Sequence, residues 1–243
     1  MIFPQLPVGV RGAIVAAAGG VLVPLPWLDE RLFPAAWLGI TLIIAVTLRA
    51  PPWLAFRLWL LSGLCAMGVT FHWIPEVAAR QLEVGAFSSF MVGLLAWTWD
   101  AFRFGVFGYL VAVVRSRGSA GILFWPVAWV GLEWVWPHVF PWQIGLTQLG
   151  WLPLCQIAEV TGVFGVSFVF MWWSAAAAPL LFARSDQFRP RPGNVPLKHF
   201  AISTVVLAAV AAWGSVRIGR IEGAAADCAN LRVAVVQPGA LDG

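Results

Sequence analysis

Seven long apolar runs, separated by short polar segments, dominate the hydrophobic pattern of this chain. They cover residues 12–28, 34–48, 53–74, 87–114, 120–136, 154–182 and 199–216. A helix that crosses the hydrocarbon core of a bilayer needs roughly 20 predominantly apolar residues, and somewhat fewer in short or tilted cases. The pattern therefore predicts an all-α polytopic membrane domain of about seven transmembrane helices, over residues 1–216.

Two alternatives remain open for the first two runs. Pro24 and Pro26 interrupt the first run and the second run is short, so the pair could form a shallow hairpin instead of two full spans. The first run could also be a secretory signal peptide, because three alanines at 16–18 follow an apolar stretch behind Arg11. We favour a retained span, because removal of this segment would disturb the charge pattern of the other loops.

Composition supports the membrane assignment and excludes several other classes. The chain is 60% hydrophobic and 11% charged, whereas about a quarter of the residues of a water-soluble domain are charged. Cys65, Cys155 and Cys228 are widely separated, with no paired spacing and no histidine nearby. This spacing supports neither a zinc site nor a disulfide framework, so we predict no metal and no cofactor.

The distribution of Lys and Arg predicts the orientation. If the N-terminus is cytoplasmic, nine basic residues fall in cytoplasmic segments, namely Arg11, Arg49, Arg57, Arg115, Arg117, Arg184, Arg189, Arg191 and Lys198. Cytoplasmic loops carry such an excess, so seven spans place the C-terminal tail outside the cytoplasm. The formal net charge of +4 thus reflects topology, and we predict no nucleic-acid partner.

Charged residues inside apolar runs usually have a partner or a function. Asp100 and Arg103 lie one helical turn apart near the middle of the fourth run, and at this spacing they can neutralise one another. The more conservative interpretation is a structural ion pair, and a role in substrate or lipid passage is the alternative. Glu133 and Glu159 are expected at the membrane interface, with hydrogen bonds to loop backbone.

The segment after the fifth run has the highest density of aromatic residues. Residues 134–145 read WVWPHVFPWQIG, and Trp151 follows. Tryptophan prefers the boundary between acyl chains and headgroups, so an aromatic belt would explain the tryptophans alone. The segment also lacks Lys and Arg and is stiffened by Pro137 and Pro141, features that suit a rigid wall of a lipid-accessible cavity.

Several motifs together resemble the membrane domain of bacterial apolipoprotein N-acyltransferase. Residues 126–134 read PVAWVGLEW, residues 140–148 read FPWQIGLTQ and residues 156–168 read QIAEVTGVFGVSF. Two weaker matches, FPAAW at 33–37 and GVTFHWI at 68–74, agree with the same family. The tail at 232–238, RVAVVQP, is similar to the opening strand of that family's nitrilase-like domain.

The resemblance implies a location and a reaction. Members of the family lie in the bacterial inner membrane with a nitrilase-like domain on the periplasmic side. They transfer an acyl chain from a phospholipid donor to the diacylated N-terminal cysteine of bacterial apolipoproteins. A cysteine thiolate first takes the acyl group as a thioester, helped by a glutamate base and a lysine, which divides one difficult transfer into two easier steps.

The tail predicts a truncated domain. We expect residues 217–230 to form a periplasmic linker and residues 231–243 to form the first strand of an α/β nitrilase-like domain that is otherwise missing. The family's catalytic glutamate, lysine and cysteine should follow that strand, and neither Lys198 nor Cys228 is a suitable substitute. No catalytic residue is therefore assigned. By position we assign Phe140, Pro141, Trp142 and Gln143 as lipid or lipoprotein contacts, with Glu133 as a possible orienting acid.

Two other functional classes were considered. One is a non-catalytic membrane module for lipid handling or transport that keeps the scaffold alone. The other is an intramembrane hydrolase that uses His138 with Glu133 or Cys155. The hydrolase is disfavoured because the chain has neither a G-x-S-x-G nor an H-E-x-x-H motif.

Overall fold

The computed structural model describes residues 8–116, 121–181, 195–226, 228 and 233–234. Every regular element among these residues is helical. The α-helices are α1 (Val8–Leu22), α2 (Phe33–Thr47), α3 (Pro52–Thr70), α4 (Ile74–Leu82), α5 (Ala86–Ser116), α6 (Phe124–Val135), α7 (Leu152–Cys155), α8 (Ala158–Thr161), α9 (Val163–Leu181) and α10 (Val195–Ala226). Three 3₁₀ turns, η1 (Leu25–Trp27), η2 (Glu30–Leu32) and η3 (Ile144–Gln148), lie in the connections.

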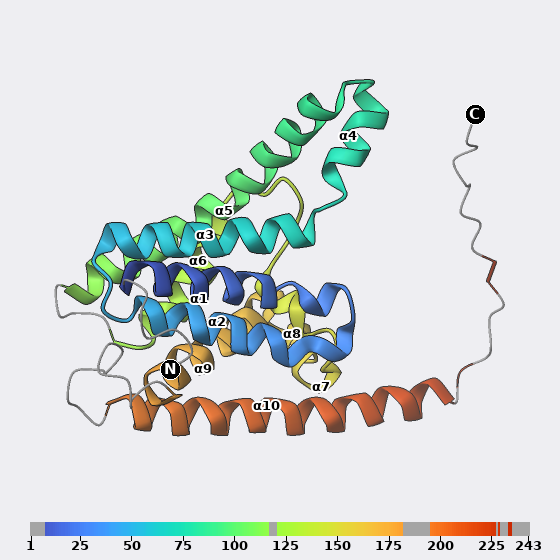
Figure 1. Cartoon of the computed structure of the whole chain (residues 1–243). Coiled ribbons are helices and arrows are strands. Elements are labelled where there is room, and N and C mark those ends of the chain that lie inside the picture. Colours follow the sequence, from blue (N-terminus) through green and yellow to red (C-terminus); the bar gives the residue numbers. More distant parts are fainter. Residues whose placement is uncertain (1–7, 117–120, 182–194, 227, 229–232, 235–243) are drawn as a thin grey trace.

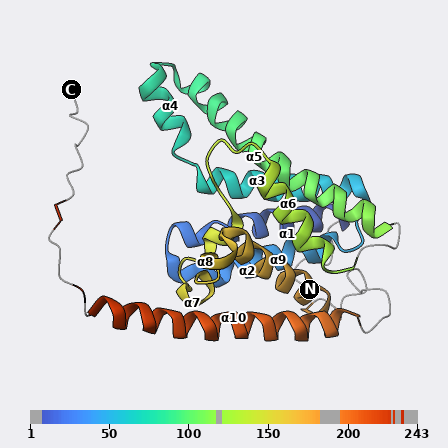
Figure 2. The ribbon, with the colours of Figure 1, turned by 180° about the vertical axis from the view of Figure 1, so that it is seen from behind.

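The long helices form one bundle with two distinct ends. In Figure 1, α1, α2, α3 and α10 run roughly side by side, and α10 lies along one edge of the bundle; Figure 2 shows the same arrangement from behind. One end carries α4, α7 and α8, and we call it the loop end. The other end, which we call the opposite end, carries the connection between α2 and α3 and the start of α10.

Five segments are long and apolar enough to cross a membrane: Gly9–Trp27, Glu30–Thr47, Pro52–Thr70, Val163–Leu180 and Leu197–Ala226. They correspond to the first, second, third, sixth and seventh predicted runs. The first two runs each give such a segment, which favours two spans over the shallow hairpin. The fourth and fifth runs correspond to α5 and α6, which do not meet the same criteria, so length and composition support five spans among the described residues.

Close contacts between glycines and neighbouring backbone set the packing of the first three helices. A Cβ atom added to Gly19 would lie 2.8 Å from the carbonyl oxygen of Gly39, and one added to Gly39 would lie 2.6 Å from that of Gly19. A Cβ on Gly20 would clash with the backbone oxygen of Ser62. Small residues therefore let α1 approach α2 and α3 at backbone contact, which is the usual device for helix packing in lipid.

Aromatic side chains fill the centre of the bundle between α3, α5 and α6. Trp59, Phe104, Phe107 and Trp129 are fully buried. Their rings meet mostly edge to face, for example Phe107 with Trp129 at 5.0 Å between centroids and 89° between planes. Such pairs stabilise beyond the area they bury, so many tryptophans of this chain serve the core in addition to the membrane boundary.

The structure changes two of the predicted boundaries. The sixth run, predicted as continuous from 154, is divided into α7, α8 and α9, and the chain turns between α8 and α9 at Gly162, with φ +65° and ψ −176°. The seventh run, predicted to end at 216, continues as α10 to Ala226. The first part of the predicted linker is therefore helical.

The predicted strand falls largely outside the described residues. Residues 231–232 and 235–243 are not described, and Val233 and Ala234 have no regular structure. Several basic residues used to predict the orientation, among them Arg117, Arg184 and Arg189, also lie outside the described part.

Replacement of Gly162 by Ala is expected to destabilise the fold. Its backbone conformation is accessible almost exclusively to glycine, and a side chain there costs on the order of 1–3 kcal/mol. The matched control is Gly131→Ala in α6, where a Cβ meets nothing within 4 Å and Ala is favoured in a helix by roughly 0.5–1 kcal/mol. Thermal unfolding in detergent should show a lower Tm for Gly162→Ala than for Gly131→Ala. Equal values would mean that the turn at 162 tolerates a side chain.

Candidate functional site

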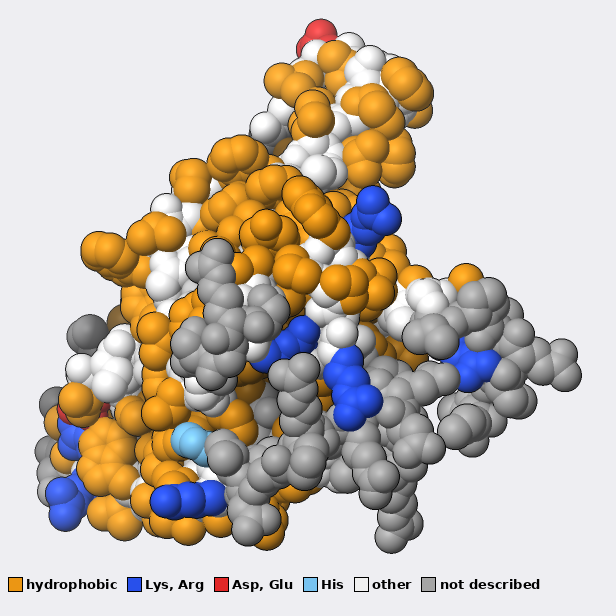
Figure 3. All heavy atoms as spheres, turned by 90° about the vertical axis from the view of Figure 1, so that its left-hand side faces the viewer, with side chains coloured by type: hydrophobic (Ala, Val, Ile, Leu, Met, Phe, Trp, Pro, Cys, Tyr) orange, Lys and Arg blue, Asp and Glu red, His pale blue; other side chains and the backbone are white. Residues whose placement is uncertain are grey.

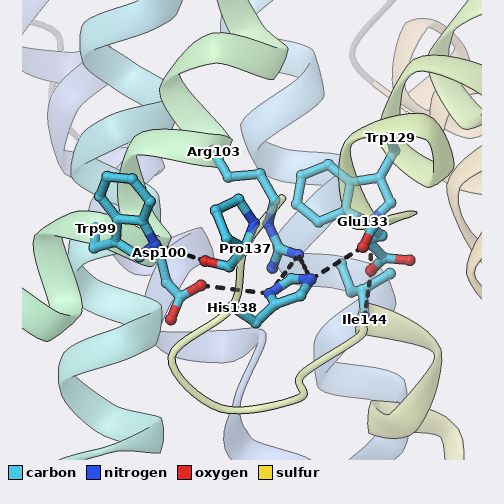
Figure 4. A network of polar contacts seen from close by, with 8 residues as sticks. All are labelled: Trp99, Asp100, Arg103, Trp129, Glu133, Pro137, His138 and Ile144. Atoms are coloured by element: carbon cyan, nitrogen blue, oxygen red, sulfur yellow. Dashed lines mark hydrogen bonds and ion pairs between the residues drawn. The ribbon is translucent and has the colours of Figure 1, made fainter. Parts of the chain in front are cut away.

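Four ionisable side chains meet inside the bundle near the loop end. Asp100 and Arg103 come from α5, Glu133 from the last turn of α6 and His138 from the loop that follows α6 (Figure 4). Asp100 is 3% exposed, Arg103 0% and Glu133 2%. We call these four residues the ionic cluster. Buried charges in a membrane protein are costly and mark either structural pairing or function.

His138 joins the two charges of α5. Its Nδ1 lies 3.5 Å from Oδ1 of Asp100, and Arg103 Nη1 lies 3.2 Å from its Nε2 and 3.3 Å from its Nδ1. Nε2 also lies 3.0 Å from the backbone carbonyl oxygen of Glu133, a contact in which the imidazole must donate, because a carbonyl only accepts. Asp100 and Arg103 attract one another electrostatically, in line with the predicted neutralisation, and His138 contacts both of them.

The guanidinium of Arg103 is enclosed by aromatic rings. Its central carbon lies 5.3 Å from the ring centroid of Trp142, 5.6 Å from that of Trp129 and 5.9 Å from that of Phe104. A guanidinium within about 6 Å of a ring face is attracted by the quadrupole of the ring, and more strongly where water is excluded. The rings thus stabilise a cation that is buried in the bundle.

Glu133 ties the start of η3 to α6. Its Oε1 accepts hydrogen bonds from Trp129 Nε1 at 2.8 Å and from the backbone N–H of Ile144 at 2.6 Å. The carboxylate also interacts electrostatically with Arg103 and with the Ser167 hydroxyl. The expected hydrogen bond to loop backbone is confirmed. The side chain lies in the last turn of α6 and is buried beneath the loop, and its position relative to the membrane interface stays a prediction.

The four predicted contact residues of the loop differ in their surroundings. Phe140 is half-buried and stacks on Phe71 with ring centroids 5.3 Å apart. Pro141 is exposed and Gln143 is half-buried. Trp142 is 1% exposed and faces Arg103. The loop therefore alternates between an outer side, with Pro141, and an inner side, where Trp142 is part of the core.

Further hydrogen bonds fix the loop on its other flank. Trp99 Nε1 donates to the carbonyl of Pro137 at 2.7 Å, as Figure 4 shows. Trp37 of α2 donates to the side-chain oxygen of Gln148 at 2.5 Å. The N–H of Gly145 donates to the Ser167 hydroxyl at 3.0 Å. Helices α2, α5, α6 and α9 thus all contribute to holding residues 137–148.

Glu159 lies in α8 and is exposed at the loop end. Arg217 of α10 donates to it twice, from Nε at 2.6 Å and from Nη2 at 2.7 Å. These hydrogen bonds, more than the accompanying charge attraction, hold the pKa of the Glu159 carboxyl below its ordinary value. The pair links the outer part of α10 to the segment that precedes α9.

The contacts of Cys155 and His138 do not join these two residues. Cys155 Sγ donates to the backbone carbonyl of Gln148 at 3.0 Å, and His138 contacts Asp100, Arg103 and Glu133. No group of three potential metal ligands occurs in the part of the chain that the structure describes.

Sequence reasoning missed the central position of His138. It noted the histidine only as a catalytic alternative, whereas the structure places it between both charged residues of α5. A signal was present, because a histidine in an apolar loop without Lys or Arg, following two charged residues in a neighbouring span, is a natural partner for them.

These features define a class: a helical membrane domain in which a buried ionic cluster holds an aromatic, proline-containing loop at one end of the bundle. The sequence profile of the apolipoprotein N-acyltransferase N-terminal domain matches residues 19–176, a stretch that includes the whole ionic cluster and the loop. The chain belongs to this family, which confirms the resemblance found in the motifs.

Curated relatives agree with the profile. The chain is 32% identical over 232 residues to the Apolipoprotein N-acyltransferase of Geobacter metallireducens, which covers 93% of this chain and 43% of that protein. It is 30% identical over 183 residues to that of Methylococcus capsulatus, covering 71% and 34%. It is 28% identical over 200 residues to that of Pasteurella multocida, covering 79% and 36%. The chain thus spans less than half the length of these relatives.

Proposed function

We propose that this chain is the membrane domain of an apolipoprotein N-acyltransferase, an enzyme that moves an acyl chain from a phospholipid to the N-terminal diacylglyceryl-cysteine of bacterial lipoproteins. The observation that carries the proposal is the loop at 137–148, which lies within the segment matched by the family profile and is held by a buried ionic cluster. A rigid loop at the end of a membrane bundle suits the presentation of a lipidated substrate to a reacting group.

The domain crosses the inner membrane with the loop end in the periplasm. Figure 3 looks onto the opposite end and shows Lys and Arg side chains spread over it. The described elements at that end contain Arg49, Arg57, Arg115 and Lys198, and an excess of basic residues favours the cytoplasmic side. The loop end, by contrast, has Glu76, Glu83 and Glu159 beside its basic residues.

We count α5 and α6 as two further spans, which leaves the orientation unchanged because five and seven are both odd. Helix α5 has 31 residues, more than a span requires, and its two central charges lie against His138 and Glu133. Helix α6 is short, with 12 residues, but it packs against α5 and α9. With both counted as spans, the chain alternates between the two ends and α10 finishes at the loop end, in agreement with Figure 1.

Within the loop, the proposed role of each residue follows from how exposed its side chain is. Phe140, Pro141 and Gln143 are the proposed contacts for lipid or lipoprotein. Trp142 and Glu133 act indirectly: Trp142 anchors the loop against Arg103, and Glu133 orients it through the N–H of Ile144.

The covalent chemistry is not assigned to these 243 residues. The resemblance implies a glutamate, a lysine and a thiolate acting together, and the chain contains a single lysine. That residue, Lys198, lies near the start of α10 at the opposite end. Cys155 donates to a backbone carbonyl and is partly buried. We therefore propose that the chain by itself binds substrate and forms no acyl thioester.

Photo-crosslinking tests the function and the orientation together. The photoreactive residue p-benzoylphenylalanine replaces Phe140 in one variant and Trp53 in a control variant. Trp53 is 65% exposed and lies in the first turn of α3, at the opposite end. A diacylated lipopeptide is added from outside to spheroplasts that express each variant. We expect labelling at 140 and background labelling at 53, because only the loop end faces the periplasm.

The diacylated lipopeptide has a free N-terminal amine, and it is compared with an unacylated peptide of the same sequence. Labelling by the lipopeptide alone supports recognition of the lipidated end. Equal labelling at 140 and 53, labelling at 53 only, or labelling by both peptides would each contradict the proposal, the last of these in favour of a general lipid-handling or peptide-binding surface.

A further inference from the structure

A helical arm projects from the loop end of the bundle. It consists of α4 and the first part of α5, up to about residue 97, and it extends away from the other helices in both Figure 1 and Figure 2. The sequence pattern gave no sign of it, because α4 is only nine residues long and contains three polar or charged side chains. We call it the α4–α5 arm.

The arm is held together by close packing of its two helices. Ile74 and Ala78, one turn apart on α4, are buried. A Cβ atom on Gly93 of α5 would lie 2.7 Å from the ring of Pro75, so the two helices meet at that glycine. At the base of the arm, Trp97 Nε1 donates to the carbonyl of Phe71 at 2.9 Å. The arm is therefore a defined structural unit and its outward faces are fixed.

The two outward faces have opposite character. On α4, Glu76 and Arg80 lie one turn apart on the face turned away from α5, and Glu83 follows directly after the helix; Arg80 donates to Glu76 at 2.7 Å and both are largely exposed. On α5, Phe87, Leu94 and Leu95 share the face turned away from α4, and Phe87 and Leu95 are 77% and 72% exposed. As a unit, the arm is polar on its α4 side and apolar on its α5 side.

The two faces of the arm have a defined orientation relative to the bilayer. The candidate span Pro52–Thr70 ends four residues before α4 begins, so the base of the arm lies at the bilayer boundary. Helix α5 has 31 residues, which at about 1.5 Å each gives about 46 Å, well beyond the roughly 30 Å of hydrocarbon. In Figures 1 and 2, α4 lies on the side of α5 that faces away from the opposite end. The apolar α5 side thus faces the membrane and the polar α4 side faces water.

We propose that the α4–α5 arm lies in the boundary layer of the loop-end leaflet, with phospholipid acyl chains packed against Phe87, Leu94 and Leu95 and the headgroups beside Glu76 and Arg80. This is the arrangement of an interfacial amphipathic element, which buries its apolar face about 5–10 Å into the headgroup and acyl boundary. The arm gives the bundle a lipid-binding surface that extends sideways from the base of the aromatic loop, where Phe71 stacks on Phe140. The proposal does not depend on acyl transfer.

Depth-dependent fluorescence quenching tests this placement of the α4–α5 arm in the bilayer. In a background with Cys65, Cys155 and Cys228 replaced by serine, single cysteines at Phe87 and Leu95 on the apolar side, and at Arg80 and Glu83 on the polar side, carry an environment-sensitive dye. The variants are reconstituted into phosphatidylcholine vesicles that contain roughly 20% of the anionic lipid phosphatidylglycerol. Nitroxides on the fifth or twelfth acyl carbon report depth, and aqueous iodide reports exposure to water.

The expected results differ between the two faces. Dyes at 87 and 95 should be quenched on the order of twofold more by the shallow nitroxide than by the deep one, and weakly by iodide, because an interfacial element sits near the acyl boundary. Dyes at 80 and 83 should be quenched mainly by iodide. Strong iodide quenching at 87 and 95 would place the arm in water and overturn the proposal. Protection from both iodide and nitroxides would also overturn it, because protein, such as a second copy of the chain, would then cover the face.

Discussion

Replacement of Arg103 by methionine is expected to be the most destabilising single change in the domain. It removes the central cation and leaves the carboxylates of Asp100 and Glu133 buried with only His138 to balance them. Breaking a buried ion pair from one side costs about 3–5 kcal/mol, because the remaining charge is uncompensated. For a chain of this size that corresponds to a fall of roughly 6–20 °C in Tm, measurable by thermal unfolding in mild detergent.

Two further variants separate the contributions to stability of the charge of Arg103 and of its planar side chain. Arg103→Lys keeps the positive charge but loses the planar group that lies against Trp129 and Trp142, so we expect an intermediate loss. The double variant Arg103→Met with Glu133→Gln removes one cation and one anion together. Its loss should be smaller than the sum of the single losses by on the order of 0.5–3 kcal/mol, the range for contacting residues. Strict additivity would show that Arg103 and Glu133 act independently.

Side chains of the surrounding helices explain how the aromatic loop keeps one conformation at the end of the membrane bundle. Backbone groups of the loop that face the bundle need partners, since little water reaches them. The structure supplies these partners from side chains: Trp99 for the carbonyl of Pro137, Ser167 for the N–H of Gly145 and Glu133 for the N–H of Ile144. Each partner belongs to a different helix, so the conformation of the loop depends on how these helices pack together.

The apolar pattern predicted the helical class and the approximate position of every long helix. This succeeded because hydrophobicity over some 20 residues is a property of the local sequence. The pattern failed where a single residue decides the backbone. Gly162 divides the sixth apolar run, and its positive φ, which the composition does not reveal, marks where α9 begins.

The site was predicted less well than the fold, because its contacts are long-range. Phe140 and Trp142 are both aromatic loop residues two positions apart, and the sequence pattern does not distinguish their surroundings. In the structure, Phe140 stacks on Phe71 at the base of the arm, whereas Trp142 covers Arg103 in the core. Asp100 and Arg103 were recognised as unusual from their place in an apolar run, but their partner His138 is 35 residues further along than Arg103. Such pairings depend on tertiary structure.

Glu133→Leu is the second change with a large expected effect, and it acts on the loop directly. Leucine leaves the N–H of Ile144 and the Nε1–H of Trp129 without an acceptor, at about 1–3 kcal/mol for each buried donor, and it deprives Arg103 of an anion. The matched variant Glu133→Gln keeps an oxygen that can accept from the same donors, so it should lose less stability. Hydrogen exchange at the Ile144 amide separates the two: exchange should accelerate strongly in the leucine variant and remain slow in the glutamine variant. If both variants exchange equally fast, the charge of Glu133 holds the loop and its hydrogen bonds do not; if neither changes, the loop is held by Trp142 and its packing alone.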